Sequence, residues 1–352
     1  MEDMVKNSFW CNKKVLVTGI TGFKGSWLSY LLWKFGANVY GISLNPNNTQ
    51  DIYNYLNNKF NTKILDITNY DELSNAINSI SPDIIFHLAA QSLVIDSYKF
   101  PMKTFNTNII GTANLLHIAS RLNNLRALIN VTTDKCYQNQ GWEWPYRESD
   151  ALGGIDPYSS SKACSEIITS AMKSSFFSKS VGIATARAGN VIGGGDWSEN
   201  RLIPDLVQSI FKDRKLIIRN SNAIRPWQHV LDPLFGYIKL AECLYEQPER
   251  YSTAWNFGPD QTSSFSVQDV INLFSILSNK KINLELINTP NNLYESEILR
   301  LDISKVKSEI KWMPKWDFDK SVSMTYIWYK NFYNGNNVED ILNEQITEYI
   351  SH

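Results

Sequence analysis

A glycine-rich turn between a strand-like and a helix-like segment constrains the fold of this chain more than any other feature. The apolar run Lys14–Thr18 leads directly into Gly19-Ile-Thr-Gly22-Phe-Lys-Gly25, where an amphipathic stretch over 22–35 begins. Glycine allows the tight turn and lets the backbone approach a pyrophosphate. The N-terminus of the following helix presents unpaired N–H groups and a partial positive charge to the phosphates. The turn therefore predicts a bound dinucleotide at the end of the first strand.

Strand-like and helix-like segments alternate over the first half of the chain. A parallel neighbour is reached only by a crossover over one face of the sheet, so strict alternation predicts parallel pairing with right-handed connections. We therefore expect an α/β fold with a Rossmann-type doubly wound parallel sheet. The expected strands are 14–18, 38–42, 62–65, 83–88, 127–132 and 181–186, and the expected helices are 22–35, 70–80, 107–122 and 158–176.

The pattern changes after about residue 190. Gly193-Gly194-Gly195 and scattered prolines separate short elements, and the alternation becomes irregular. We expect residues 1–190 to form the dinucleotide-binding domain and residues 191–352 a smaller C-terminal α/β substrate lobe. The chain is expected to cross back to the first domain around 228–230 and 256–258. Partly helical terminal elements, from residue 312 onward, should pack on the smaller lobe.

Charge and cysteine content exclude several classes of protein. The chain has 34 basic and 35 acidic residues, whereas nucleic-acid-binding surfaces collect lysine and arginine. Its 4 cysteines form no CxxC pair, so we expect no metal site, no disulfide framework and a reducing compartment. The N-terminus does not resemble a signal peptide, and no apolar run approaches the ~18 residues of a membrane helix. A cytoplasmic protein without nucleic-acid or membrane partners is expected.

The residues around the turn leave the choice of nicotinamide cofactor open. NAD-binding folds often end their second strand on a carboxylate that binds the ribose 2′-OH, but this chain has Gly41-Ile-Ser-Leu-Asn45 there. Lys24 would favour the 2′-phosphate of NADP. Asp66, after the third expected strand, is either a contact for the adenine edge or a helix cap before Tyr70. We expect NAD, with NADP as the alternative.

Tyr158 and Lys162 are separated by four positions in Tyr158-Ser-Ser-Ser-Lys162 and therefore share one face of the expected helix. A phenol has a pKa of about 10, so lowering the pKa of Tyr158 to near 7 requires roughly 4 kcal/mol of preferential phenolate stabilisation. An adjacent ammonium and a cationic nicotinamide would supply it. Such a spacing is also common in surface pairs. Behind a glycine turn on this fold, it indicates a catalytic pair.

Several motifs make the chain resemble the extended short-chain dehydrogenase/reductase superfamily of NAD-dependent epimerases and dehydratases. The superfamily motifs are Thr18-Gly-Ile-Thr-Gly-Phe-Lys-Gly25, His87-Leu-Ala-Ala-Gln91 and Tyr158-Ser-Ser-Ser-Lys162. Longer motifs are similar to those of the CDP-glucose 4,6-dehydratases, and the likeness covers nearly the whole chain. They are Phe9-Trp10, Thr21-Gly-Phe-Lys-Gly-Ser-Trp27, Thr133-Asp-Lys-Cys-Tyr137, Arg187-Ala-Gly-Asn-Val-Ile-Gly-Gly-Gly-Asp-Trp197 and Arg225-Pro-Trp-Gln-His-Val230.

The resemblance implies a hydro-lyase that turns CDP-D-glucose into CDP-4-dehydro-6-deoxy-D-glucose and water, as in deoxysugar and O-antigen biosynthesis. It implies that Tyr158 is the base for the sugar 4-OH, Lys162 its electrostatic partner and ribose contact, and Thr133 a donor to the 4-oxygen. Asp134 would protonate the departing 6-hydroxyl. Lys135, where dTDP-glucose relatives carry glutamate, either removes the C5 proton as a neutral amine or stabilises the enolate while another group moves that proton.

The resemblance also implies which residues contact the two ligands and a second copy of the chain. We expect a homodimer through the helices at 107–122 and 158–176. Arginine suits the substrate diphosphate because its planar fork binds two oxygens at once. The expected cofactor contacts are Gly19, Thr21, Gly22, Phe23, Lys24, Gly25, Asp66, Ile67, Leu88, Ala89, Ala90, Thr107, Thr132, Tyr158 and Lys162. The expected nucleotide-sugar contacts are Gln91, Thr133, Asn190, Arg201, Arg225 and Asn256.

Some positions depart from the family pattern or allow two interpretations. The stretch Ala89-Ala-Gln-Ser-Leu-Val-Ile95 lacks a proline and an arginine of the family, which leaves the exact hexose open. His229 is either a ligand contact or a core histidine, and we favour the core. Trp227 is expected to serve packing.

Two other functions stay open. The first is a 4-epimerase or 4-reductase of a nucleotide hexose, and the second is a catalytically silent dinucleotide-binding sensor or scaffold. Asp134 beside Thr133 favours dehydration, because an epimerase has no leaving hydroxyl to protonate. The intact Tyr158–Lys162 pair argues against a silent protein.

Overall fold

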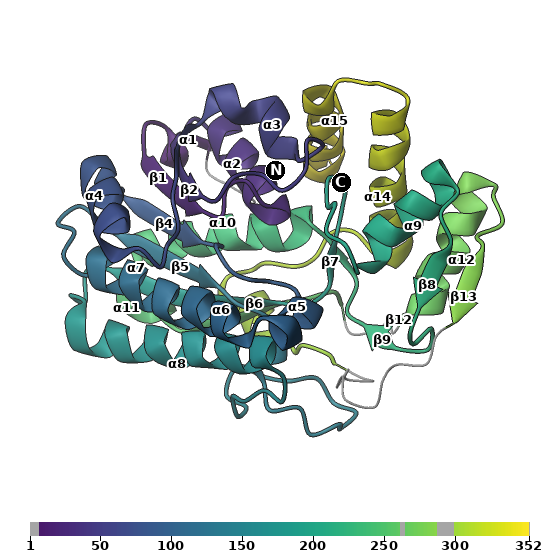
Figure 1. Cartoon of the computed structure of the whole chain (residues 1–352). Coiled ribbons are helices and arrows are strands. Elements are labelled where there is room, and N and C mark those ends of the chain that lie inside the picture. Colours follow the sequence, from purple (N-terminus) through teal and green to yellow (C-terminus); the bar gives the residue numbers. More distant parts are fainter. Residues whose placement is uncertain (1–6, 261–264, 287–298, 352) are drawn as a thin grey trace.

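A seven-stranded parallel sheet forms the centre of the computed structural model, which describes residues 7–260, 265–286 and 299–351 (Figure 1). Its strand order is β11-β6-β5-β4-β1-β2-β3, and each neighbouring pair is parallel. The order reverses between β1 and β4, which is where ligands bind in such sheets. The expected Rossmann-type fold is confirmed. The strands are β1 Lys14–Thr18, β2 Asn38–Ser43, β3 Asn61–Ile64, β4 Ile84–His87, β5 Ala127–Val131, β6 Gly182–Ala188 and β11 Ala254–Phe257.

Alternate residues of the central strands enter two separate hydrophobic cores, because successive side chains of a strand point to opposite faces. In β1, Val15 and Val17 join one core and Leu16 the other. Burial on both faces explains why these strands read as continuous apolar runs. Helices α2 (Phe23–Lys34) and α10 (Leu231–Glu246) cover one face, and α4 (Tyr70–Ile80), α7 (Thr112–Ala119) and α8 (Pro157–Phe176) cover the other (Figure 1).

Local capping sets where the helices beside the sheet begin. Helix α8 starts one residue before the expected 158, because Pro157 occupies its first turn and the carboxylate of Asp156 accepts a hydrogen bond from Ser159 N at 2.9 Å. Helix α4 coincides with the expected range 70–80, and the side chain of Asn69 caps it. None of the described helices is long and apolar enough to cross a membrane.

The helix expected at 107–122 begins earlier and contains a wider turn. It is built from α6 (Pro101–Phe105), the π-helical segment η2 (Asn106–Gly111) and α7. Pro101 starts it, because proline is favoured at a first helical position. In η2, Asn108 accepts from Gln91 N at 2.8 Å and donates to Ser161 Oγ at 2.8 Å. The π turn therefore connects the loop after β4 to α8, and such turns often occur at functional sites.

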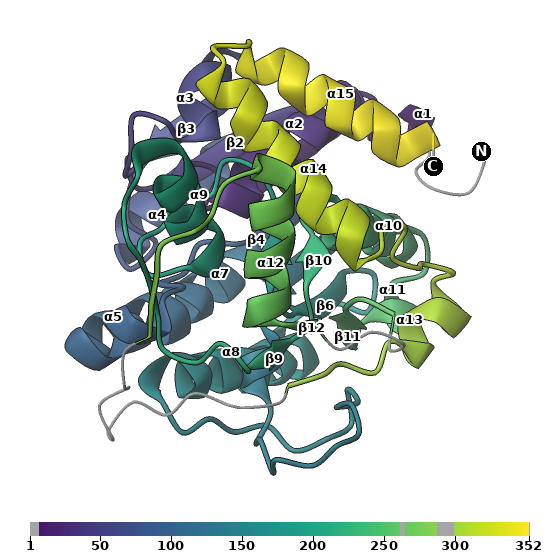
Figure 2. The same ribbon diagram turned by 90° about the vertical axis from the view of Figure 1, so that its right-hand side faces the viewer.

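The second half of the chain forms a smaller lobe and also contributes to the main sheet (Figure 2). Strand β11 pairs with β6 and aligns Asn256 with Arg187, so the return expected at 256–258 is confirmed. At the return expected at 228–230, β10 pairs with β7 in a separate sheet and adds no strand to the main one, but the chain then enters α10, which packs on β5 and β6. The lobe contains β7 Val191–Ile192, α9 Leu202–Lys212, β8 Leu216–Ile218, β9 Ile224–Arg225, β10 Gln228–His229, β12 Phe265–Ser266, α12 Val267–Ser278 and β13 Leu284–Leu286.

The C-terminal helices pack on both halves of the molecule, not on the smaller lobe alone. Helix α14 (Phe318–Tyr333) contacts α12, whereas α15 (Val338–Ser351) lies beside α2 (Figure 2). Tyr30 of α2 donates to Asn343 of α15 at 2.8 Å. One core therefore extends through both halves. The remaining helices are α1 Asn7–Trp10, α3 Ile52–Leu56, η1 Asn57–Lys59, α5 Val94–Lys99, η3 Asp134–Cys136, α11 Pro248–Tyr251 and α13 Ser304–Glu309.

The close approach inside the glycine turn predicts a difference between two alanine variants. A Cβ on Gly25 would lie 2.0 Å from the carbonyl oxygen of Gly19, so Gly25→Ala requires the backbone to move. We expect it to lower the free energy of unfolding by about 3 kcal/mol. Gly22→Ala is the matched control, because its Cβ would lie 3.4 Å from the same oxygen and its φ is −78°. Denaturant unfolding measures both, and equal stabilities would contradict the prediction.

Candidate active site

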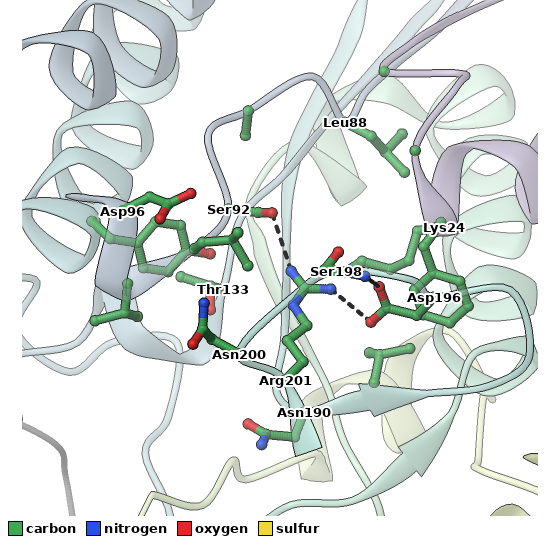
Figure 3. A pocket seen from close by; sticks show the side chains of 18 of the residues that line it. Lys24, Leu88, Ser92, Asp96, Thr133, Asn190, Asp196, Ser198, Asn200 and Arg201 are labelled. Atoms are coloured by element: carbon green, nitrogen blue, oxygen red, sulfur yellow. Dashed lines mark hydrogen bonds and ion pairs between the residues drawn. The ribbon is translucent and has the colours of Figure 1, made fainter. Parts of the chain in front are cut away.

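The carboxyl ends of β1, β4, β5 and β6 open into a cavity of about 610 Å³ (Figure 3). It is lined by residues of both halves of the chain, as expected where the carboxyl ends of parallel strands meet at one edge. Every expected cofactor contact lines this cavity, from Gly19 to Lys162. The expected chemical and substrate residues that line it are Thr133, Asp134, Lys135, Asn190, Arg201 and Arg225.

Two expected substrate contacts do not line the cavity. The amide of Gln91 closes a turn in its own loop, where it donates to Leu93 O at 2.9 Å and accepts from Leu93 N at 3.1 Å. Asn256 is fully buried in β11, accepts from Tyr137 at 2.7 Å and donates to the backbone of Tyr146 at 2.9 Å. In this structure both amides are engaged by protein groups, and their contact with the substrate stays a prediction.

Neutral side chains line the end of the cavity after β2. Ser43, which lines it, shares a hydrogen bond of 2.6 Å with Thr21, and Asn45 follows in the same wall. Asp66 also lines the cavity, and its carboxylate accepts from Thr68 N at 2.9 Å while the cap of α4 itself is Asn69. Asp66 thus stabilises the turn before α4 and still faces the cavity.

Lys24 lies at the other, catalytic end of the cavity. Burial lowers its pKa to about 7, assisted by the charges of Lys162 and Arg201 and opposed by Asp134. In Figure 3 its side chain lies near Asp196 and Arg201. Lys24 is thus influenced by the charges of Lys162, Arg201 and Asp134, and its effect on the choice between NAD and NADP stays a prediction.

The segment after β5 presents a hydroxyl, a carboxylate and an ammonium at successive positions. Thr133 caps η3 and donates from Oγ1 to Asp134 Oδ1 at 2.9 Å. Lys135 Nζ lies 3.2 Å from the same oxygen. Asp134 is fully buried, and its Oδ2 has no hydrogen-bond partner among the described residues. That oxygen lies beside Gly189, where a Cβ would be 3.1 Å away.

Tyr158 and Lys162 lie on one face of α8, as the spacing predicts, and the protein groups around the phenol do not by themselves lower its pKa. Burial raises the pKa of Tyr158 to about 12, a hydrogen bond with Thr133 lowers it, and the charge of Asp134 raises it. Burial also lowers the pKa of Lys162 to about 8, and its ammonium donates to Val131 O at 3.2 Å. The lowering of the phenol pKa by Lys162 together with a cationic nicotinamide stays a prediction.

The wall toward the smaller lobe carries arginines. Arg201 Nη1 lies 2.9 Å from Asp196 Oδ2, and its Nη2 donates to Ser92 Oγ at 3.1 Å (Figure 3). Arg225 is buried and lines the same cavity. The sequence analysis did not name Ser92 and Asp196 as candidate site residues. Both nevertheless lie in segments that it quoted, Ser92 in 89–95 and Asp196 in 187–197. Together with Lys24, these arginines give the cavity the positive charge that diphosphates require.

A second cavity of about 560 Å³ adjoins the first at Lys135. Arg219, which the sequence analysis did not single out, lines both. Its other walls come from the segment after the catalytic residues, including Tyr137, Gln138 and Gly153. Lys135 therefore lines both cavities. Residues common to both are Val94, Ile95, Lys135, Asn190, Arg219 and Arg225.

His229 belongs to the core, as favoured. It is fully buried, its ring centroid lies 4.6 Å from that of Trp316, and burial lowers its pKa to about 3. Trp227 is nearly buried and joins the main core, and one side of it lines the cavity.

Comparisons with known proteins find relatives over the whole chain. The family model for GDP-mannose 4,6 dehydratase matches residues 16–325. CDP-glucose 4,6-dehydratase of Salmonella typhimurium is 40% identical, and the match covers 99% of each chain. UDP-glucose 4-epimerase of Mycoplasma pneumoniae is 26% identical over 91% of this chain and 98% of the relative. The solved structure of dTDP-glucose 4,6-dehydratase from Bacillus anthracis in complex with NAD superposes with a TM-score of 0.76 at 22% identity, covering 92% of this chain and 98% of that one.

The position of Lys24 predicts that NAD binding depends on pH. An anionic diphosphate favours the ammonium, so binding takes up a proton wherever free Lys24 is neutral. Affinity should be highest below the free pKa of about 7 and fall roughly tenfold as pH rises by two units. Titration calorimetry at several pH values measures this.

Two variants serve as controls for Lys24. Lys24→Met should weaken NAD binding and remove the change in affinity near pH 7. The pH profile of NAD affinity should then keep only its descending limb near pH 8, which comes from Lys162 with its pKa of about 8. Lys24→Arg should keep the affinity while also losing the change near pH 7, because a guanidinium stays charged. An unchanged pH dependence in Lys24→Met would show that another group is responsible.

Proposed function

Because the chain belongs to the GDP-mannose 4,6-dehydratase family, we propose that it is a nucleotide-sugar 4,6-dehydratase that acts on CDP-D-glucose with bound NAD. The observation that carries the proposal is the Asp134–Lys135 ion pair, held at 3.2 Å in the same cavity as Tyr158 and Lys162. The match over 99% of the Salmonella CDP-glucose enzyme supports the choice of nucleotide. The product would be CDP-4-dehydro-6-deoxy-D-glucose.

The residues of the cavity fit NAD. Gly25 touches the backbone of Gly19, so the first turn of α2 lies close to the strand end where a diphosphate binds. The neutral wall at Ser43 and Asn45 suits a ribose with a free 2′-hydroxyl. When bound, NAD accepts a hydride from C4 of the sugar and returns it to C6.

Oxidation at C4 requires a base for the 4-hydroxyl proton, and we assign this role to Tyr158. Its pKa of about 12 in the free protein means that the phenolate depends on bound ligands, and the positive charge of the oxidised cofactor supplies the necessary stabilisation. Thr133 hydrogen-bonds to the phenol, and we assign it the contact with the 4-oxygen, to which its hydroxyl would turn from Asp134. Lys162 adds a positive charge on the same face of α8.

Loss of water requires one base and one acid, and the Asp134–Lys135 pair provides both in its neutral form. Transfer of one proton across the 3.2 Å contact turns ammonium and carboxylate into amine and carboxylic acid, which desolvation by a bound substrate favours. Lys135 then takes the C5 proton, the C6–O bond breaks, and Asp134 protonates the departing hydroxyl. The step leaves the ion pair that the structure contains.

A proton path closes the cycle. Lys135 returns its proton to C5 as the hydride reaches C6. Thr133 hydrogen-bonds both to Asp134, at 2.9 Å, and to Tyr158, so the proton that Tyr158 took from the 4-hydroxyl passes through it to Asp134. Tyr158, Asp134 and Lys135 thereby regain their starting states. This cycle favours dehydration over epimerisation, which has no use for the acid.

We also propose a cytoplasmic homodimer that supplies 4-keto-6-deoxy sugars to polysaccharide biosynthesis, including O-antigen. Large apolar side chains on the two helices expected at the dimer contact support the assembly. Ile110 is 49% exposed, and Ile167 and Phe176 of α8 are 56% and 61% exposed. Burial of such side chains between two copies would be favourable. A near-neutral charge and four free cysteines fit a reducing compartment.

The substrate proposal predicts a distinct product. The protein, supplied with catalytic NAD and separately with CDP-glucose, UDP-glucose, dTDP-glucose and GDP-mannose, should convert CDP-glucose into a nucleotide 4-keto-6-deoxyhexose. Mass spectrometry detects the loss of water, and alkali-induced ultraviolet absorbance detects the ketone. Dehydration of another nucleotide sugar alone would correct the base, inversion at C4 would identify an epimerase, and no product from any would refute the proposal.

Variants of Tyr158 and Lys135 should stop the reaction at different stages. Tyr158→Phe should abolish turnover and leave the NAD dissociation constant within about twofold. Lys135→Met should accumulate a nucleotide 4-ketohexose that keeps its 6-hydroxyl, because C4 oxidation does not need the C5 base. Rapid-quench mass spectrometry separates the two.

Lys135→Glu distinguishes the two roles of Lys135. If Lys135 is the C5 base, a carboxylate at this position should recover part of the turnover lost in Lys135→Met. Lower turnover in Lys135→Glu than in Lys135→Met would show that the positive charge itself acts on the enolate.

A further inference from the structure

A fully bonded carboxylate lies directly behind the catalytic residues. Glu166 is on α8, four positions after Lys162, and its side chain is 3% exposed. Its Oε1 accepts from Thr132 Oγ1 at 2.5 Å and from Arg187 Nε at 2.9 Å. Its Oε2 accepts from Thr185 Oγ1 at 2.7 Å and from Arg187 Nη2 at 2.8 Å. One side chain therefore connects α8 to the end of β5 and to β6.

The network continues to the far side of the catalytic segment. Arg187 Nη1 donates to Tyr137 Oη at 2.8 Å, and Tyr137 Oη donates to Asn256 Oδ1 at 2.7 Å. Thr132 precedes Thr133 directly, and Tyr137 follows η3 directly. Both ends of the segment that carries Thr133, Asp134 and Lys135 are therefore bonded to the Glu166–Arg187 pair.

Stability alone is a weak reason for this arrangement. Burying two charges has a large desolvation cost, and well-packed apolar residues often serve a core equally well. Apolar contacts do not fix the orientation of their partners. The two carboxylate oxygens and the planar guanidinium do, because each hydrogen bond requires a defined direction. The pair is thus suited to hold two catalytic elements in one geometry.

The charge of Glu166 acts on the catalytic pair as well. Tyr158, Lys162 and Glu166 follow at intervals of four residues and share one face of α8. Burial lowers the pKa of Lys162, and the negative charge of Glu166 raises it. Glu166 therefore favours the ammonium form of Lys162 at neutral pH.

We propose that Glu166, with Arg187, is a positioning residue. Through Thr132 it sets the distance between the Tyr158–Lys162 pair on α8 and the Thr133–Lys135 segment after β5. The roles of those five residues rest on the proposed function. Glu166 itself does not line the cavity, so it acts through the groups that it holds.

Two threonine variants test the geometric role. Thr132→Val and Thr185→Val each remove one hydroxyl donor to the same carboxylate, but only Thr132 adjoins the catalytic segment. We expect Thr132→Val to lower kcat at least about tenfold with little change in KM, because small misplacements of reacting groups are costly. Thr185→Val should stay within about twofold. Equal kcat values in the two variants, at matched stability, would overturn the proposal.

The NAD dissociation constant separates positioning from direct contact, since Thr132 also lines the cavity. It should stay within about twofold in both variants. If Thr132→Val loses its activity through weakened NAD binding, Thr132 acts as a cofactor contact and the proposal is wrong. The comparison uses whichever reaction at the sugar C4 the parent protein catalyses. A wrong dehydratase assignment would change the product of the parent protein, whereas a wrong positioning proposal would show only as equal kcat values in the two variants.

Glu166→Gln tests the charge without relying on turnover. It removes the negative charge that raises the pKa of Lys162, so the limb of NAD binding near pH 8 should move to lower pH. Glu166→Asp should keep that limb in place and lower kcat through its shorter reach. An unmoved limb in Glu166→Gln would refute the electrostatic part. If Glu166→Gln does not fold, the threonine pair still decides the positioning role.

Discussion

Close backbone contact at the carboxyl end of β1 is the constraint on which the rest of the molecule depends. Gly25 in the first turn of α2 lies against the carbonyl of Gly19, and a Cβ on Gly19 would lie 2.8 Å from Ala89 N in the loop after β4. His87 strengthens this point, because its ring hydrogen-bonds to Thr18 at 2.7 Å and to Thr112 of α7 at 3.0 Å. The strand order reverses here, so the contact leaves a crevice in which N–H groups of α2 face the space for phosphates.

The charges in this crevice are arranged for ligands that carry the opposite sign. Buried Lys24 and Lys162 have pKa values lowered to about 7 and about 8, and the pKa of Tyr158 is raised to about 12. Each shift arises first from burial, which disfavours the charged form of the group. Diphosphates would stabilise the ammonium groups, and a cationic cofactor would stabilise the phenolate. Ligand binding would therefore also shift the pKa values of Lys24, Lys162 and Tyr158 toward their charged forms.

Short-range pattern predicted much of the fold and many of the residues that line the cavity. The range of β1 follows from its continuous apolar run and that of α4 from its capping, and the residues expected around the glycine turn all line one cavity. Hydrogen bonds between segments far apart in the chain could not be predicted from the sequence. Gln91 ends a recognised motif and Asn256 was assigned by resemblance to related enzymes, yet their amides bond to backbone groups close by or far along the chain. Nothing in local sequence tells a buried amide from an exposed one.

The sequence by itself determined the parallel sheet, the dinucleotide turn and the identity of the reactive groups, because each depends on residue type over a few neighbouring positions. Only the tertiary structure decided that Lys24 is influenced by Lys162, Arg201 and Asp134, that Asp134 Oδ2 has no hydrogen-bond partner among the described residues, and that Glu166 joins α8 to β5 and β6. These properties depend on burial and on distances between segments far apart in the chain. Charge, desolvation and hydrogen-bond geometry are set in three dimensions, and so is the chemistry of the site.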